Sequence, residues 1–264
     1  MKMKTIKKYL NIIVRIAVYS FMGSLEYRTQ TVMRLVRIAI EFFLALLFIN
    51  AFFSHTNSIS GWDNHSVILT LGIFNVLFAL VYFFISENLY SLGKDIKKGD
   101  IDGVLIKPLD TQFFLSCRKM HPQNIFRIIG GMIIIAYAIN SAGILLTFAN
   151  VSLFLLTFLS GIIICFSLLS LIGTLGFWTY TSALYDLVNT TLSVSRYPTD
   201  IFPRAAVFAL TVIPLIFIAT VPAKTLIGKT DLLTWLSPFL AVGIFVLARK
   251  FLFYALGTYT SASS

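Results

Sequence analysis

Few residues of this chain could do chemistry, and many of them lie in one charged block. The block reads GKDIKKGDIDGVLIKPLD and spans Gly93–Asp110, with four lysines, four aspartates, three glycines and one proline. Catalysis usually needs a nucleophile, acid or base held beside a partner group. No such set stands out along the chain, so the sequence predicts no catalytic residue.

The acids and histidines outside this block have ordinary explanations. Glu41 follows Arg37 by four residues, a spacing that allows an ion pair across one helical turn. His55, Asp63 and His65 share one short segment, but their spacing is not the tight spacing typical of metal ligands. We therefore predict neither a metal site nor a chain of acids that could relay protons.

Two further candidates are also weak. Cys117 and Cys165 lie far apart in unlike surroundings, which is typical of ordinary free thiols. The stretch AKTLIGKT, Ala223–Thr230, nearly matches the phosphate-binding loop G-x-x-x-x-G-K-[ST], but alanine replaces the first glycine and no predicted strand precedes it. We expect no nucleotide site and no enzymatic activity in this chain.

The composition indicates a membrane protein. Hydrophobic residues make up 58% of the chain, charged residues only 12%, and the mean hydropathy is +0.87. A soluble domain has about a quarter charged residues, so a water-soluble fold is excluded. The net charge of +10 could suit nucleic acid, but basic residues of membrane proteins gather in cytoplasmic loops beside anionic lipid. We predict no nucleic-acid partner.

The apolar runs predict an all-α protein with six transmembrane helices, because a span needs roughly 20 apolar residues. Residues 1–35 mix basic and apolar positions, which predicts an amphipathic helix lying in the membrane interface, or else one packed on the spans. Residues 86–124 form a long loop and residues 249–264 a tail. The predicted spans are 36–54, 67–85, 128–148, 151–173, 205–223 and 232–248.

The distribution of Lys and Arg predicts the orientation. Basic residues lie before and at the start of the first span, in 94–127, at Arg196 and Arg204, and at the C-terminal end. Since Lys and Arg are enriched in cytoplasmic loops, placing both termini inside leaves only Lys224 and Lys229 of the 21 basic residues outside. The loop 86–124 is then cytoplasmic, and loops this long are usually functional.

The charged block predicts one or two short amphipathic helices joined by a tight turn. Gly99 and Gly103 punctuate it and Pro108 ends it. Such an element can insert into a groove on a partner, although a solvated loop or a helix on lipid headgroups fits the charge pattern equally well. On the partner hypothesis, Ile101 and Leu105 anchor the groove. The charged residues at its rim are then Lys98, Asp100 and Asp102.

The same block resembles the first cytoplasmic loop of ABC-2-type ABC transporter permeases, approximately G-x-L/I-D-x-x-L-x-x-P-L/V. A second stretch, 196–228, is similar to the R-Y-P…I-Y-P motif of one subgroup and the proline-containing span that follows it. The C-terminal GTYTSASS is similar to a common ending, R-R-Y-T-S-A-G-S. The matching residues are Gly99, Asp100, Ile101, Asp102, Leu105, Pro108 and Leu109, then Arg196, Tyr197, Pro198, Ile201, Pro203, Pro214, Phe217, Ile218, Pro222, Ala223, Leu226 and Gly228.

This resemblance implies a permease subunit of an ATP-driven exporter in the bacterial cytoplasmic membrane. Its partners would be a cytoplasmic ATPase dimer, which binds the ATP and Mg, and a second permease chain, often a different one. The charged block would be the coupling helix, and 225–235 would hold short re-entrant helices. The prolines themselves predict that Arg196–Pro198 and Pro203 form an interfacial segment before the fifth span. In that span, Pro214 and Pro222 predict a kink or a flexing point.

Two other functions stay open from the residues alone. One is a channel or secondary carrier that needs no ATP, and the other is an assembly subunit that transports nothing. The cargo is not identified by any motif, although spans rich in Phe, 25 of 264 residues, would suit an amphipathic drug, peptide or lipid-like molecule. Transport by the lone chain without ATP would favour the channel or carrier.

Overall fold

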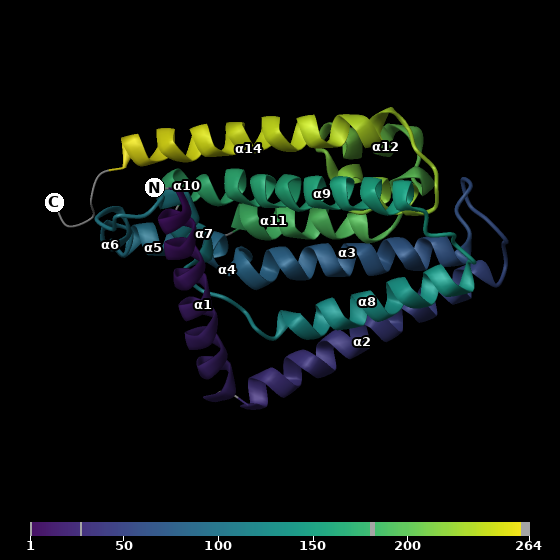
Figure 1. Ribbon diagram of the computed structural model, residues 1–264, viewed down its shortest axis with the longest axis horizontal. Helices are drawn as coiled ribbons and strands as arrows, with labels where there is room; N and C mark the ends of the chain where they lie inside the picture. Colours follow the sequence, from purple (N-terminus) through teal and green to yellow (C-terminus); the bar gives the residue numbers. More distant parts are fainter. Residues whose placement is uncertain (1, 27, 180–182, 260–264) are drawn as a thin grey trace.

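The computed structural model describes residues 2–26, 28–179 and 183–259, and this part of the chain is helical without a strand (Figure 1). Long helices lie side by side, and short helices gather at both ends of the bundle. The helices are α1 (Lys2–Glu26), α2 (Arg28–Phe53), α3 (Asn64–Phe84), α4 (Ser86–Tyr90), α5 (Leu92–Lys97), α6 (Asp102–Leu105), α7 (Thr111–Cys117), α8 (Asn124–Ser141), α9 (Phe148–Thr174), α10 (Gly176–Thr179), α11 (Ala183–Leu192), η1 (Ser193–Arg196), η2 (Thr199–Ile201), α12 (Arg204–Val212), η3 (Leu215–Phe217), α13 (Thr220–Leu226) and α14 (Leu232–Thr258).

Four described stretches are long and apolar enough to cross a membrane, which indicates a multi-pass membrane protein. They coincide with the second, third, fourth and sixth predicted spans. The first predicted span, 36–54, lies in the continuous helix α2, which is not among these four. The four stretches are Asn64–Phe84, Asn124–Ser141, Phe148–Thr179 and Leu232–Thr258.

The region predicted as the fifth span, 205–223, is not one helix. It is divided into α12, the 3-10 turn η3 and α13. Pro214 lies at the first break, where a proline can neither donate a backbone hydrogen bond nor fit its ring within a continuing helix. The break is therefore larger than the kink that the sequence predicts at Pro214. The predicted re-entrant segment 225–235 likewise differs, because it joins the end of α13 to the start of α14.

The motif RYPTDIFP lies at the opposite end of the bundle from the charged block, which corrects the prediction that both face the cytoplasm. Trp62, in the loop after α2, donates a hydrogen bond of 3.2 Å from Nε1 to Oδ2 of Asp200. Lys224 Nζ lies 2.9 Å from Asp200 Oδ2 and 3.3 Å from Asp231 Oδ2. The cause is α11, which carries the chain back along α9 before the motif begins (Figure 1).

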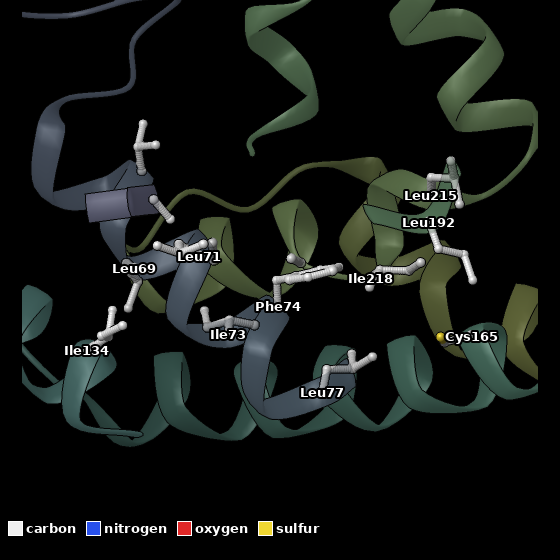
Figure 2. Close-up of a cluster of buried hydrophobic side chains, with 14 of the residues drawn as sticks. Leu69, Leu71, Ile73, Phe74, Leu77, Ile134, Cys165, Leu192, Leu215 and Ile218 are labelled. Atoms are coloured by element: carbon white, nitrogen blue, oxygen red, sulfur yellow. The ribbon is translucent and has the colours of Figure 1, made fainter. Parts of the chain in front are cut away.

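Helix α3 is the most enclosed of the long helices, and the core is built around it. It packs along α8, where a Cβ added to Gly131 would stand 3.1 Å from the Gly72 carbonyl oxygen. Small residues at such a crossing let two backbones approach closely. Figure 2 shows Phe74 and other apolar side chains of α3 between residues of neighbouring elements, including Ile134 of α8 and Cys165 of α9.

The two terminal helices extend differently from the predicted boundaries. The predicted N-terminal helix over 1–35 is divided between α1 and α2, which meet in a V (Figure 1). One side of α1 contacts the loop 86–124, with the Tyr9 and Phe113 rings 4.8 Å apart edge to face, while Val14 and Val18 are exposed. The predicted tail 249–264 is helical to Thr258, and its residues 260–264 lie outside the described part.

Candidate functional site

The charged block folds as α5 and α6 joined by a left-handed turn at Gly99. Gly99 has a φ of +76°, a conformation that glycine adopts without steric cost. The Gly99 N–H donates to the Ile96 carbonyl (3.1 Å), and the Asp100 N–H donates to the Asp95 carbonyl (3.0 Å). These two bonds form the Schellman motif, which satisfies carbonyls at a helix end. The predicted pair of short helices is therefore present.

The apolar stripe of the block is internal. Ile96, Ile101 and Val104 are buried against one another and against α7, α10 and α14. Ile101 is 0% exposed, so its side chain stabilises the block and is not available to a partner. This corrects the expectation that Ile101 anchors a groove on another protein. The residues that enclose the three are Leu92, Leu115, Phe177, Leu252 and Ala255.

The tip of the block is both apolar and exposed. Leu105 is 40% exposed and Ile106 is 84% exposed, and Lys107 and Pro108 are exposed beside them. Lys107 adds the apolar stem of its side chain to this surface. Its Nζ lies 4.1 Å from the centroid of the Phe114 ring. Leu105 and Pro108 are thus placed where a partner could contact them. Ile106 matches none of the motif positions that indicated a partner contact in the sequence.

The charged residues of the block surround this tip. Lys98 and Asp100 are exposed, and Asp102 is half-buried in the first turn of α6. The residue at the N-cap of α6 is Ile101, and its side chain makes no capping hydrogen bond. An acidic residue in the first turn favours the helix through its dipole. Asp102 therefore stabilises α6 by its charge.

A partly buried ion pair fastens α5 to the end of α7. Asp95 pairs with Arg118, and both side chains are 13% exposed. Ser91 Oγ also donates to Asp95 Oδ2 at 2.9 Å. Burial lowers the pKa of Arg118 from its ordinary value, because the charged guanidinium loses water. The pair holds the block in place, and removing either partner would leave a poorly hydrated charge.

Asn88, near the start of the loop 86–124, is hydrogen-bonded to residues near the end of the same loop. Its side-chain amide donates to the carbonyls of Ser116 (2.9 Å) and Lys119 (2.7 Å), and its oxygen accepts from the Lys119 N–H at 3.0 Å. The side chain is fully buried. No sequence pattern predicts this role, because a single asparagine in a loop is compositionally ordinary.

Asp110 joins three parts of the chain at the end of the block. Arg249 of α14 donates to it, with Nη2 2.7 Å from Oδ2, and also donates to Gln112 Oε1 at 2.9 Å. The Asp110 N–H donates to the Tyr9 hydroxyl of α1 at 3.1 Å. The hydrogen bond from Arg249 lowers the pKa of Asp110, which also caps α7 by accepting from the Phe113 N–H.

Neither cysteine suggests reactive chemistry. Both are free, as predicted, and burial raises the pKa of the Cys117 thiol to about 11. Within residues 2–26, 28–179 and 183–259, no group of three or more His, Cys, Asp or Glu could hold a metal ion.

The second set of predicted residues does not join the block. Arg196 lies with its guanidinium 5.8 Å from the centroid of the Phe74 ring, and Tyr197 contacts Phe48 edge to face at 6.2 Å. The prolines take separate positions. Pro198, Pro214 and Pro222 are buried, and exposed Pro203 precedes the first residue of α12. The two sets therefore lie in different parts of the molecule.

Comparison with known protein families agrees with the resemblance of the two motifs. The family described as ABC-2 family transporter protein matches residues 39–263. A search of curated proteins and a search of solved structures found no match. The match covers most of the chain, including the charged block and the RYPTDIFP segment. This chain is therefore a member of the ABC-2 transporter family, as an ABC-2-type permease.

Proposed function

We propose that this chain is the permease subunit of an ATP-driven exporter and is driven by a separate cytoplasmic ATPase dimer through residues 93–110. ABC-2 permeases are membrane transport components, generally not catalytic themselves, and typically pair with an ABC ATPase. ATP and Mg are bound by that partner. The observation that carries the proposal is the exposed apolar tip, Leu105–Pro108, on a helical element with its own core.

The contacts of the block suit it to transmit a displacement. Its core includes Phe177 of α10, the short helix after α9, and Leu252 of α14, and its end is held to α14 through Asp110 and Arg249. A partner that closes on ATP and pushes the tip would move these helices together. The partner would thereby stabilise one of two arrangements of the bundle, inward-facing or outward-facing. The helices would move between these arrangements as rigid bodies.

The assembly that we propose places both termini and the block in the cytoplasm. Two permease chains form the pathway, and we favour two different chains, as the family resemblance implies. The membrane is the bacterial cytoplasmic membrane. The apolar helices that could cross a membrane support a multi-pass arrangement of this kind.

Substitution of the tip tests the coupling. We expect Ile106→Asp or Leu105→Asp to lower the amount of ATPase that copurifies by at least about tenfold, because a carboxylate would be desolvated in the apolar contact. Leu145→Asp is the matched control, since Leu145 is 82% exposed but lies in the turn before α9, away from the block. Copurification with a coexpressed candidate ABC ATPase and the ATP hydrolysis of that complex are the measurements.

Normal copurification and normal transport by Ile106→Asp would contradict the proposed coupling. Cargo movement by the lone chain in liposomes without nucleotide would favour a channel or secondary carrier instead. Stable binding of the ATPase with no cargo-dependent ATP hydrolysis would favour an assembly subunit.

A further inference from the structure

A polar cavity of about 540 Å³ lies between α2, α3, α8 and α11, away from the tip of the block. Its lining includes the N-terminal half of α2, the first turn of α8 and the segment that follows α11. Arginines contribute most of its charge. The charged residues of the lining are Arg34, Arg37, Arg127, Arg196 and Glu41, beside His121.

The single acid of the lining does not balance these arginines. Glu41 forms the predicted pair with Arg37, at 2.9 Å, and a second pair with Arg127. Arg127 also donates to Asn75 Oδ1 at 3.0 Å. The carboxylate of Glu41 is therefore shared between two guanidinium groups, and it lies within a network that fixes their positions.

Arg34 and Arg196 have no carboxylate partner within the described part of the chain. Nε of Arg196 is buried without a hydrogen-bond partner among these residues, and its guanidinium lies 5.8 Å from the centroid of the Phe74 ring. A buried donor is normally paired, and guanidinium groups suit phosphate and carboxylate geometry. The free donor beside an excess of positive charge points to an anionic ligand.

One wall of the cavity is aromatic. The Phe74 and Phe78 rings stack with centroids 4.7 Å apart, and the Phe78 and Tyr82 rings stack at 4.6 Å. These side chains belong to one face of α3 and line the same cavity as the arginines. A ligand with an anionic head and an apolar body would match both surfaces, whereas a small inorganic anion would use only one.

We propose that this cavity binds an amphipathic organic phosphate, with Arg34 and Arg196 holding the phosphate and the half-buried Phe78 and Tyr82 contacting the apolar part. The ligand could reach the cavity as a membrane phospholipid or as a water-soluble phosphate ester, which share this chemistry. The inference does not depend on the proposed ATPase coupling, because binding is measured on this chain alone.

The test is retention of a phospholipid by the purified full chain. The protein is held in phosphatidylcholine nanodiscs containing a small fraction of phosphatidylglycerol, released into detergent, and its bound phosphatidylglycerol is counted by native mass spectrometry. We expect Arg196→Gln and Arg34→Gln each to lower retention by about tenfold, since a hydrogen bond to a charged group is worth at least about that factor. Arg196→Lys keeps the positive charge but loses the guanidinium geometry, so its retention should lie between that of the wild type and that of Arg196→Gln.

Two further variants separate binding from misfolding. Lys250→Gln removes one positive charge from an exposed position of α14 outside the cavity, and retention should be unchanged. Glu41→Gln removes the acid of the lining, and retention should rise. The proposal would be overturned if the wild type, Arg196→Gln and Arg34→Gln retained equal amounts of phosphatidylglycerol. It would also be overturned if Lys250→Gln lost as much phosphatidylglycerol as the two cavity variants.

Competition identifies the source of the ligand. Phenyl phosphate is added at increasing concentration to the lipid-loaded protein. Displacement of phosphatidylglycerol from the wild type by phenyl phosphate assigns the site to water-soluble phosphate esters. Retention of the lipid by the wild type at saturating phenyl phosphate assigns the site to phospholipid headgroups.

Discussion

At the scale of single residues, glycines mark where this fold leaves no room for a side chain. Gly99 is required by its backbone conformation, since its φ of +76° closes the turn between α5 and α6. Gly161 of α9 is required by space, because an added Cβ would stand 2.7 Å from the carbonyl oxygen of Phe217 and 3.2 Å from that of Ile218. Neither neighbour is a flexible side chain, so neither can move aside cheaply.

Gly99→Ala should destabilise the charged block by about 1–2 kcal/mol, the cost of a left-handed conformation for a residue with a Cβ. Gly103→Ala is the matched control, because an added Cβ there meets nothing within 4 Å. Thermal unfolding in detergent measures both variants. If neither Gly99→Ala nor Gly103→Ala changed the melting temperature, the turn at Gly99 would not require a glycine.

Gly161→Ala should lower the unfolding temperature, because the new methyl group would force α9 away from η3. Overpacking of this kind typically costs about 1–3 kcal/mol. Gly243→Ala in α14 has open space around the added Cβ and should be neutral or slightly stabilising. If Gly161→Ala were as stable as Gly243→Ala, the close packing of α9 on η3 would be refuted.

At the scale of elements, the junction at Asp110 joins α1, α7 and α14. Tyr9 accepts from its backbone, and Arg249 donates to its carboxylate. Lys8 adds a hydrogen bond of 3.0 Å from Nζ to the Pro108 carbonyl. Contacts from three elements meet at the end of the charged block, so the junction determines how the block is oriented against the bundle.

This junction should weaken in acid. The pKa of Asp110 is lowered from 3.8 in the folded state by the hydrogen bond from Arg249. A group with a lowered folded pKa contributes stability above its unfolded pKa and loses it as the pH falls through the folded value. We expect Asp110→Asn to be less stable than the wild type near neutral pH and to show a smaller loss on acidification below about pH 4.

Thermal unfolding between pH 7 and pH 3 is the measurement for this pair. Asp100→Asn is the control, since Asp100 is exposed and lies on the same block. An acid dependence in Asp110→Asn as steep as in the wild type would place the responsible carboxylate elsewhere.

At the scale of the whole molecule, the charged block and the RYPTDIFP segment lie at opposite ends of the bundle (Figure 1). If the block is cytoplasmic, then Asp200, Lys224 and Arg204 belong to the external side or to the membrane near it. This arrangement revises the predicted position of Arg204, which the positive-inside pattern alone had assigned to the cytoplasm.

Cysteine labelling tests this arrangement. In a Cys117→Ser, Cys165→Ser background, Lys98→Cys should react only with a reagent that enters the cytoplasm. Lys229→Cys, exposed in the turn between α13 and α14, should react from outside in intact cells. Arg204→Cys should follow Lys229→Cys and not Lys98→Cys. Labelling of Lys98→Cys from outside would overturn the orientation and the proposed coupling together.

Local patterns were enough for part of the fold and of the site. The pair Arg37–Glu41 was predictable because both residues lie one turn apart on the same helix. The helices of the charged block were predictable because glycine and proline act within a few residues. Ile101 could not be assigned correctly, since its apolar spacing is the same whether the stripe faces a partner or an internal core.

The sequence by itself determined that this is a helical membrane protein of the ABC-2 family, because hydrophobicity, charge distribution and short motifs depend on composition and order alone. Only the tertiary structure decided that α11 returns the chain along α9, that Asp110 meets Arg249, and that four arginines share one cavity. These features join residues distant in the chain. They depend on how the helices pack, and no local spacing specifies that.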